Sequence, residues 1–269
     1  MRKVISKDGT SIAFDQPGHG PALILVGGAS STRRDQAAVA DALAPYFTVF
    51  AFDRRGRGDS GDTAPYAVKR EVEDIEALIN EAGGSAFVFG HSSGAILALE
   101  AARLIPTKIK KLALYEPPFI IDNSRPPAPE NSASHLAELI SSGQRGAAVE
   151  YFMTLVGMPT ESIAQMRQSP MWPEMEKIAH TLVYDLIITG DTQSGDPSTL
   201  RKWATVTVPT LVMDGTVFLG NEANHTFMRT GAQEITKILP DARHRTLEGQ
   251  DHGAADDVLV PVLKEFFIG

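Results

Sequence analysis

Short apolar runs alternate with amphipathic stretches along most of the chain. The apolar runs occupy residues 22–26, 47–52, 87–89, 112–115 and 210–213. Runs of this length fit buried strands and are far too short to cross a membrane. Between them, apolar residues recur with the helical period at 35–43, 68–79, 95–104, 230–239 and 258–267. This alternation predicts an α/β fold, in which a mostly parallel sheet is covered by helices on both faces.

Two short strand-like segments, residues 4–6 and 11–14, flank Lys7-Asp8-Gly9-Thr10 near the start of the chain. Asp and Gly both tolerate a positive φ, so the Asp8-Gly9 pair favours a tight hairpin turn. We therefore expect the chain to open with an antiparallel pair of strands at the edge of the sheet.

The alternation of strand-like and helical segments stops between Pro117 and Trp203. A proline-rich stretch at 124–129 leads into helical patterns at 134–140 and 147–156. An insertion between two strands of a parallel sheet lies over the carboxyl ends of the strands, where such sheets bind ligands. We interpret this part of the chain as a helical lid over a substrate pocket.

The predicted organisation is therefore an α/β core, residues 1–116 and 204–269, with a helical cap at residues 117–203. Large apolar side chains of the cap are candidates for the wall of the pocket. They are Phe152, Met153, Met158, Met166, Met171 and Trp172. The alternative is that these side chains form the cap's own core, a common role for methionine and aromatic residues.

Composition narrows the chemistry. The chain has 269 residues, of which 43% are hydrophobic, and this is enough for one large core. It has no cysteine, which excludes a thiolate nucleophile, a disulfide framework and a thiolate zinc site. The absence of a thiol therefore favours a hydroxyl group as the nucleophile.

The net charge and the spacing of histidines and glycines indicate which partners the chain can bind. The net charge is −8 and the pI is about 5.4, so the chain lacks the basic surface that nucleic acid requires. No two histidines stand at a helical His-x-x-x-His spacing, and the Gly27-Gly28 pair lacks both nucleotide-binding fingerprints, so we expect neither a metal nor a cofactor. The start of the chain turns polar at once, and we expect a mature cytoplasmic protein without a membrane anchor.

The motif with the clearest chemistry is Gly90-His91-Ser92-Ser93-Gly94, which fits Gly-x-Ser-x-Gly. The strand-like run 86–89 precedes it and the helix-like run 95–99 follows it, so Ser92 would occupy a strained strand-to-helix turn that only small neighbours permit. A helix start behind Ser92 also favours developing negative charge. The alternative is a glycine-rich turn with an incidental serine.

On this motif the chain resembles the α/β-hydrolase family over almost its whole length. Leu25-Val26-Gly27-Gly28-Ala29 stands where that family has its oxyanion loop, and residues 52–60 resemble its structural Asp-x-Arg-Gly-x-Gly-x-Ser segment. The resemblance implies that Ser92 is the nucleophile. It also implies an oxyanion hole made by the N–H of Ser93 and that of either Gly28 or Ala29.

His252 is the candidate base. It follows the predicted last strand, 243–247, and precedes the last helix, which is the base position of the family that the chain resembles. An imidazole there can take the proton of Ser92 and return it to the leaving group. The other histidines lie at less suitable places, and His91 is the variable residue of the motif.

The acid of the triad is the open question. Most members of the family carry an aspartate three residues beyond the glycine that ends strand seven, but Gly215 is followed there by Phe218. Glu116 and Asp214 are the plausible substitutes, with Glu222 third. Glu116 ends an apolar strand before two prolines, so its carboxylate should emerge at the carboxyl edge of the sheet near Ser92.

We favour Glu116, because leaving a carboxylate unpaired at that place would be costly and its longer arm suits a reach to His252. The arrangement resembles the zearalenone-lactonase-like group, which has a glutamate after strand six. The alternative role of Glu116 is a salt bridge that caps a helix or holds the lid. The alternative role of Asp214 is a turn residue that bonds its own loop.

A serine nucleophile implies acyl transfer to water, with hydrolysis of a small carboxylic ester or lactone as the default reaction. Carbon–carbon bond hydrolases and cofactor-free perhydrolases share this elbow and stay open as alternatives. A non-catalytic ligand-binding protein on the same fold is the alternative from a different class, favoured by Phe218. The expected partner is a small-molecule substrate, and the sequence indicates no oligomeric state.

Overall fold

The computed structural model describes residues 1–217 and 223–269, without the side chains of residues 223–225. The predictions that concern Phe218 and Glu222 therefore lie outside the described residues. Within the described ranges the strands form one eight-stranded sheet in the order β1-β2-β4-β3-β5-β6-β7-β8. Their bounds are β1 Arg2–Ile5, β2 Ser11–Asp15, β3 Ala22–Val26, β4 Thr48–Phe52, β5 Ala86–His91, β6 Ile109–Tyr115, β7 Thr210–Gly215 and β8 Ala242–Leu247.

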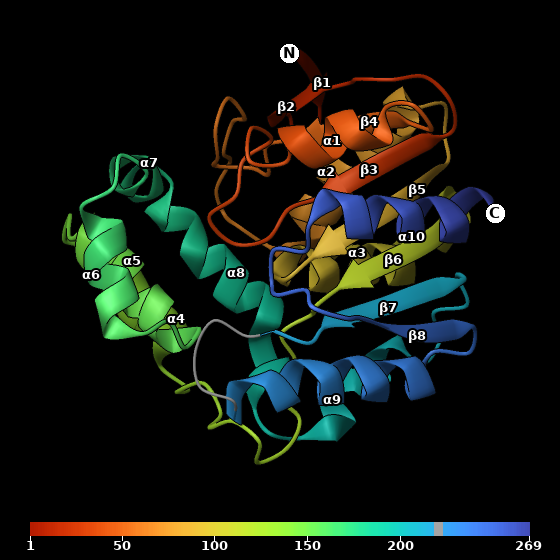
Figure 1. Cartoon of the computed structure of the whole chain (residues 1–269). Helices are drawn as coiled ribbons and strands as arrows, with labels where there is room; N and C mark the ends of the chain where they lie inside the picture. Colours follow the sequence, from red (N-terminus) through yellow and green to blue (C-terminus); the bar gives the residue numbers. More distant parts are fainter. Residues whose placement is uncertain (218–222) are drawn as a thin grey trace.

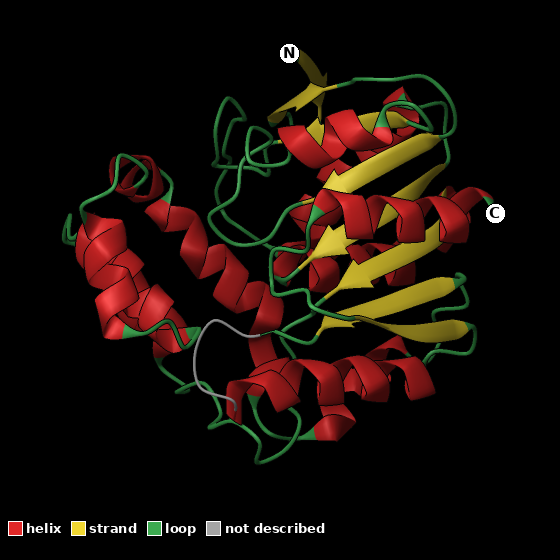
Figure 2. Cartoon of the chain, viewed as in Figure 1, coloured by secondary structure: helices red, strands yellow, loops and turns green. Residues whose placement is uncertain are grey.

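The predicted hairpin opens the chain. Strand β1 pairs antiparallel with β2, and Gly9 between them has a φ of +88°. Strand β2 also pairs antiparallel with β4, whereas every pair from β4 through β3 and β5 to β8 is parallel. The carboxyl ends of these parallel strands consequently share one edge, toward which the arrowheads point in Figure 2. The prediction of a mostly parallel α/β sheet is confirmed.

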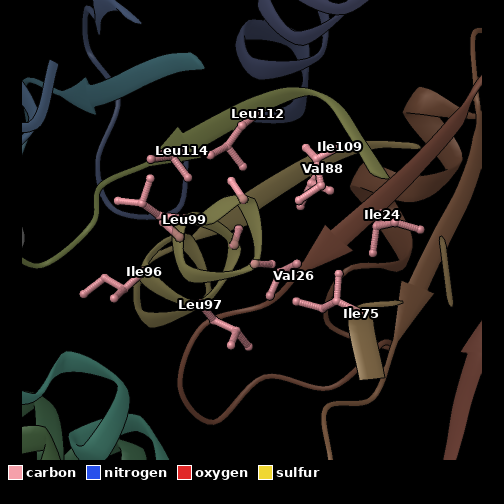
Figure 3. Close-up of a cluster of buried hydrophobic side chains, with 14 of the residues drawn as sticks. Ile24, Val26, Ile75, Val88, Ile96, Leu97, Leu99, Ile109, Leu112 and Leu114 are labelled. Atoms are coloured by element: carbon pink, nitrogen blue, oxygen red, sulfur yellow. The ribbon is translucent and has the colours of Figure 1, made fainter. Parts of the chain in front are cut away.

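Helices cover both faces of the sheet (Figure 1). Helices α2 (Val68–Glu81), α3 (Ser93–Leu104) and α9 (Ala223–Ile238) bury their apolar sides in one core cluster. Helices α1 (Ala37–Leu43) and α10 (Asp256–Ile268) pack into a second cluster on the opposite face. Figure 3 shows the first cluster, where aliphatic side chains of β3, β5 and β6 meet those of α3. Two apolar layers around a sheet buried on both faces hold its carboxyl edge rigidly.

Two elements are longer than the apolar pattern predicts. Strand β6 begins at Ile109 instead of residue 112, and Lys110 and Lys111 lie within it. Helix α9 begins at Ala223 instead of residue 230, through a polar first turn. Two lysines interrupt the apolar run of β6, and polar residues surround the buried Phe227 and Met228 in α9, so hydrophobic periodicity did not mark either extension.

The part of the chain between β6 and β7 is helical. It contains α4 (Ser132–Ser141), α5 (Arg145–Leu155), α6 (Thr160–Arg167), α7 (Trp172–Lys177) and α8 (Leu182–Thr189), with short 3₁₀ helices at Ala179–Thr181, Gly190–Gln193 and Pro197–Trp203. Another 3₁₀ helix, Pro106–Lys108, precedes β6. In Figure 1 helices α4 to α7 stand beyond the carboxyl ends of the strands, and α8 leads back to the sheet.

Most of the predicted pocket-wall residues form a core of this helical part instead. Phe152, Met153 and Trp172 are buried in a cluster with Leu136 and Val149, and Met158 and Met166 pack against it. Met171 is 60% exposed. In the part of the chain that the structure describes, none of the helices has both the length and the apolar character needed to cross a membrane.

Candidate active site

Ser92 lies on a sharp turn between β5 and α3. Its backbone has φ 56° and ψ −128°, a conformation that costs a residue with a side chain about 1–3 kcal/mol. The neighbouring glycines allow the turn: a Cβ on Gly90 would lie 2.6 Å from the Cα of Ala95, and one on Gly94 would collide with the carbonyl oxygen of Val26. The Ser92 N–H donates to the carbonyl of Tyr115 at 2.9 Å. The turn is therefore held at the carboxyl end of β6.

Glu116 and His252 are brought together across the sheet edge. Glu116 directly follows β6, is 4% exposed and has a positive φ of 47°. One carboxylate oxygen, Oε1, accepts the N–H of Gly215 at 2.9 Å, and Oε2 lies 2.6 Å from His252 Nδ1. Since both oxygens are engaged, the carboxylate has one orientation, and that orientation places the proton of the imidazole on Nδ1.

The loop that carries His252 is held at its backbone by the ends of two strands. His91 Nε2 lies 2.7 Å from the carbonyl oxygen of His252, and the Tyr115 hydroxyl donates to the carbonyl of Asp251. The rings of His91 and His252 have centroids 4.6 Å apart. His252, whose side chain is 40% exposed, thus stands beside the residue that precedes Ser92.

His91 has a structural role that the sequence motif did not indicate, because His91 occupies the variable position of the motif. Burial, and then the neighbouring His252, lower the pKa of His91 to about 3. The imidazole is therefore neutral at pH 7, and because its partner is a carbonyl oxygen, Nε2 carries the proton and donates. His91 positions the backbone of His252.

Ser92 makes no hydrogen bond to His252, which lies beside His91, the residue before Ser92. Among the described residues the Ser92 hydroxyl has no hydrogen-bond partner within 3.5 Å, His252 included. Catalytic hydrogen bonds often tighten only when substrate is bound. The arrangement brings a serine on a strained turn next to an imidazole that is oriented by a carboxylate.

Asp214 is engaged elsewhere. It is fully buried, and its carboxylate is bound by His244 Nε2 at 2.6 Å, Arg229 Nε at 2.8 Å and the Thr246 hydroxyl at 3.0 Å. Although burial raises the pKa of Asp214, these bonds, led by that of His244, lower it below its usual value. Of Glu116 and Asp214, Glu116 is the one that contacts His252, while Glu222 lies outside the described residues.

The predicted oxyanion residues lie on both sides of Ser92. Ser93 begins α3, and a Cβ on Gly28 would lie 2.9 Å from the Cβ of Ser92. The carbonyl oxygen of Gly28 accepts from Arg57 Nη1 at 2.6 Å. In a trans peptide the C=O and the following N–H point in opposite directions, so the N–H of Ala29 points away from Arg57. The Gly28–Ala29 peptide is thus held by Ser31, whose hydroxyl donates to the same carbonyl oxygen at 3.0 Å, and by an arginine, Arg57.

That arginine belongs to a buried ionic cluster that the sequence did not indicate. Arg54 pairs with Glu71 of α2 and with Asp185 of α8, and Arg57 pairs with the same Asp185. The two arginines belong to the segment 52–60 that resembles a structural motif of the family. Asp185 lies in the helical insertion, where no sequence motif marks it. In the described ranges, there is no group of three or more His, Asp or Glu side chains arranged to hold a metal ion.

A family model described as the alpha/beta hydrolase family matches residues 23–260. A crystal structure of an alpha/beta hydrolase from Sphaerobacter thermophilus DSM 20745 is similar, with 51% identity and a TM-score of 0.89 over 99% of this chain and 100% of that chain.

Curated relatives match over shorter stretches. N-formylmaleamate deformylase from Pseudomonas putida is 36% identical over 104 residues, 38% of this chain and 39% of the relative. The first curated relatives are matched over 31% to 42% of their length. The structure of N-formylmaleamic acid deformylase from Pseudomonas putida S16, 24% identical with a TM-score of 0.65 over 97% of this chain and 98% of that chain, shares the fold.

Proposed function

Because the chain belongs to the α/β-hydrolase family, we propose that it is a serine hydrolase that cleaves a small carboxylic ester or lactone through an acyl-enzyme. Ser92 is the nucleophile, His252 the general base and Glu116 the acid of the triad. The observation that carries the proposal is the 2.6 Å contact between Glu116 Oε2 and His252 Nδ1, beside a serine on a strained turn. A paired carboxylate and imidazole next to such a serine are what a nucleophilic hydroxyl requires.

The chemistry follows from the tautomer that Glu116 selects. With the proton on Nδ1, His252 Nε2 is free to accept the Ser92 proton as the Ser92 oxygen attacks the carbonyl carbon of the substrate. The protonated imidazole, stabilised by Glu116, then gives this proton to the leaving alcohol oxygen, and the acyl group stays on Ser92. Water, deprotonated by His252, attacks the acyl-enzyme and releases the carboxylic acid.

The negative charge of the tetrahedral intermediate needs two converging N–H groups. We assign these to Ser93, at the start of α3, and to Ala29. Ala29 is preferred to Gly28 because the Arg57 bond to the Gly28 carbonyl turns the next N–H away from Arg57. The helix start at Ser93 adds a favourable dipole for the oxyanion.

Residues 117–203 act in this proposal as the cap that encloses the acyl and alcohol parts of a small-molecule substrate. Ala29 supports this role, because it packs against the apolar cluster of the helical part. The glutamate after β6 is the feature by which the chain resembles the zearalenone-lactonase-like group. A lactone therefore belongs among the first substrates to test.

Amide hydrolysis is the second candidate reaction. It is favoured by the 36% identity with N-formylmaleamate deformylase over 38% of this chain. The same triad can protonate an amine leaving group instead of an alcohol. A formamide with an activated leaving group, compared with the matching formate ester, distinguishes the two reactions by their kcat/KM.

The test uses a fluorophosphonate probe together with p-nitrophenyl butyrate and a small lactone. The parent protein should be labelled at Ser92 and should turn over an ester or a lactone, whereas Ser92→Ala should lose both properties while it stays folded by circular dichroism. Ser134→Ala, at an exposed helix residue, is the matched control and should behave as the parent. Turnover retained in Ser92→Ala would refute the nucleophile, and an unlabelled, inactive parent would favour the ligand-binding alternative.

A further inference from the structure

Asp185 is a buried acid of the helical part that reaches the active-site turn. It lies on α8, is 1% exposed, and its Oδ1 accepts from the Ser93 hydroxyl at 2.7 Å. Its other oxygen, Oδ2, accepts from Arg57 Nη2 at 2.7 Å. One carboxylate of the insertion therefore bonds both to the residue after Ser92 and to the arginine behind the Gly28 loop.

Each of these two bonds orients one side of the proposed oxyanion hole. Arg57, held by Asp185, donates to the Gly28 carbonyl oxygen at 2.6 Å. This is the shortest of the bonds to that oxygen, which also accepts from Ser31. The Ala29 N–H therefore points to the opposite side of the peptide. The Ser93 hydroxyl, held by the same carboxylate, limits the rotation of the first residue of α3. The two N–H groups must converge on one point to stabilise an oxyanion. Because the Asp185 carboxylate contacts both sides, it can align the two groups together.

The charges of the cluster keep the Asp185 carboxylate ionised and therefore able to accept from both Ser93 and Arg57. Although burial raises the pKa of Asp185, the charges of Arg57 and Arg54 lower it below its usual value, so the carboxylate stays ionised. Burial and then repulsion by Arg54 lower the pKa of Arg57. Within the described residues Arg57 Nε has no hydrogen-bond partner, and an unpaired buried donor costs about 1–3 kcal/mol. Replacing a whole buried ion pair by apolar residues is often neutral for stability, whereas removing one partner is strongly destabilising. Folding of an Asp185 variant therefore has to be measured beside its activity.

We propose that Asp185 is a positioning residue that aligns the Ser93 and Ala29 N–H groups, so that the oxyanion hole is complete only while α8 is docked against the sheet. The inference rests on the proposed function, and it adds a dependence of catalysis on the helical part. Withdrawal of α8 removes the carboxylate from Ser93 and Arg57 together.

Asp185→Asn tests the link to Arg57 with little change in shape. The amide oxygen can still accept from Ser93, but its NH₂ group then meets Arg57 Nη2, donor against donor. Ser93→Ala removes the other link and keeps the backbone N–H. Tyr184→Phe is the matched control, because it removes a bond between the same helix and the core, Tyr184 to Asp62 at 2.7 Å, away from the oxyanion loop.

The readouts are kcat and KM for p-nitrophenyl butyrate and the Ki of a trifluoromethyl ketone, which forms a tetrahedral oxyanion on the serine. Asp185→Asn should lower kcat roughly 10- to 100-fold with KM within about 3-fold, and should weaken the ketone by a similar factor. Ser93→Ala should show the same pattern at about 3- to 10-fold, and Tyr184→Phe should match the parent. Equal losses for substrate binding and ketone binding would indicate a merely structural role and would overturn the inference.

The outcomes separate this inference from the function on which it rests. A parent protein that is neither labelled at Ser92 nor active refutes both proposals. An active parent labelled at Ser92, with an unchanged kcat and ketone Ki in Asp185→Asn and Ser93→Ala, refutes the positioning role alone. Should Asp185→Asn fail to fold, Ser93→Ala decides the question by the same two constants.

Discussion

Replacing Glu116 by glutamine tests the acid of the triad with an almost unchanged shape. Glu116 Oε1 accepts the Gly215 N–H, so the glutamine oxygen will take that place and its NH₂ group will face His252 Nδ1. An imidazole next to a donor must accept at Nδ1 and carry its proton on Nε2. The nitrogen that faces the serine side can then no longer take the Ser92 proton.

The size of the effect follows from this change of tautomer. In serine triads the corresponding loss is about 10⁴-fold in kcat. The His252 side chain is 40% exposed, so water can solvate the working tautomer in part, and we expect a smaller loss. We predict that Glu116→Gln lowers kcat for p-nitrophenyl butyrate by about 10³-fold, or about 4 kcal/mol in the barrier.

Asp214→Asn is the comparison that makes the assay decisive. Asp214 bonds His244, Arg229 and Thr246, so its substitution should lower the melting temperature and leave kcat per folded molecule near that of the parent. Both variants are assayed below their melting temperatures, with the folded fraction measured by circular dichroism. A parent-like kcat in Glu116→Gln together with a collapse in Asp214→Asn would reverse the assignment of the acid.

Two further predictions concern the surroundings of Ser92. The pKa of His91 is lowered to about 3 by burial and then by His252, whereas an unfolded histidine titrates near 6.5. Between these values the unfolded chain binds a proton that the folded chain does not, so the free energy of unfolding falls as the pH drops from about 6.5, by up to about 1.4 kcal/mol per pH unit. Urea titrations at pH 7 and pH 5 measure this fall in the free energy of unfolding. The fall should be smaller for His91→Asn than for the parent or for the control His135→Asn, which changes an exposed histidine. Equal falls in all three proteins would contradict the burial of a neutral His91. Gly28→Ala would place a Cβ 2.9 Å from the Cβ of Ser92, so this variant should lower kcat about 10-fold or more. Gly61→Ala, whose new Cβ would lie 3.5 Å from its nearest neighbour, is the control and should keep the kcat of the parent. Equal kcat values for the two variants would mean that the Gly28 loop does not border the nucleophile.

Local patterns predicted the framework of the site because each part has a local cause. The glycines around Ser92 are needed by the turn itself, and the two prolines after Glu116 end β6 where its carboxylate can emerge at the sheet edge. The position of His252 after the last strand followed from the family resemblance. These features depend on residues within a few positions of one another, so the sequence displays them.

The remaining features depend on contacts between distant segments. Whether Gly28 or Ala29 offers its N–H was undecidable from the sequence, since the peptide is oriented by Arg57. Asp185 contacts Ser93 from the helical insertion, and a single aspartate on a helix carries no sign of such a partner. The apolar residues of the insertion, Phe152 among them, form its own core, which is the alternative that the sequence left open beside a pocket wall.

The central claim is that the acyl group of the substrate is carried on Ser92. The most direct measurement is rapid acid quench of the parent with excess p-nitrophenyl butyrate, followed by peptide mass spectrometry. We expect a butyryl adduct on the peptide that contains Ser92, formed together with a burst of one equivalent of p-nitrophenol. Turnover without an adduct on that peptide, or an adduct on another residue, would contradict it.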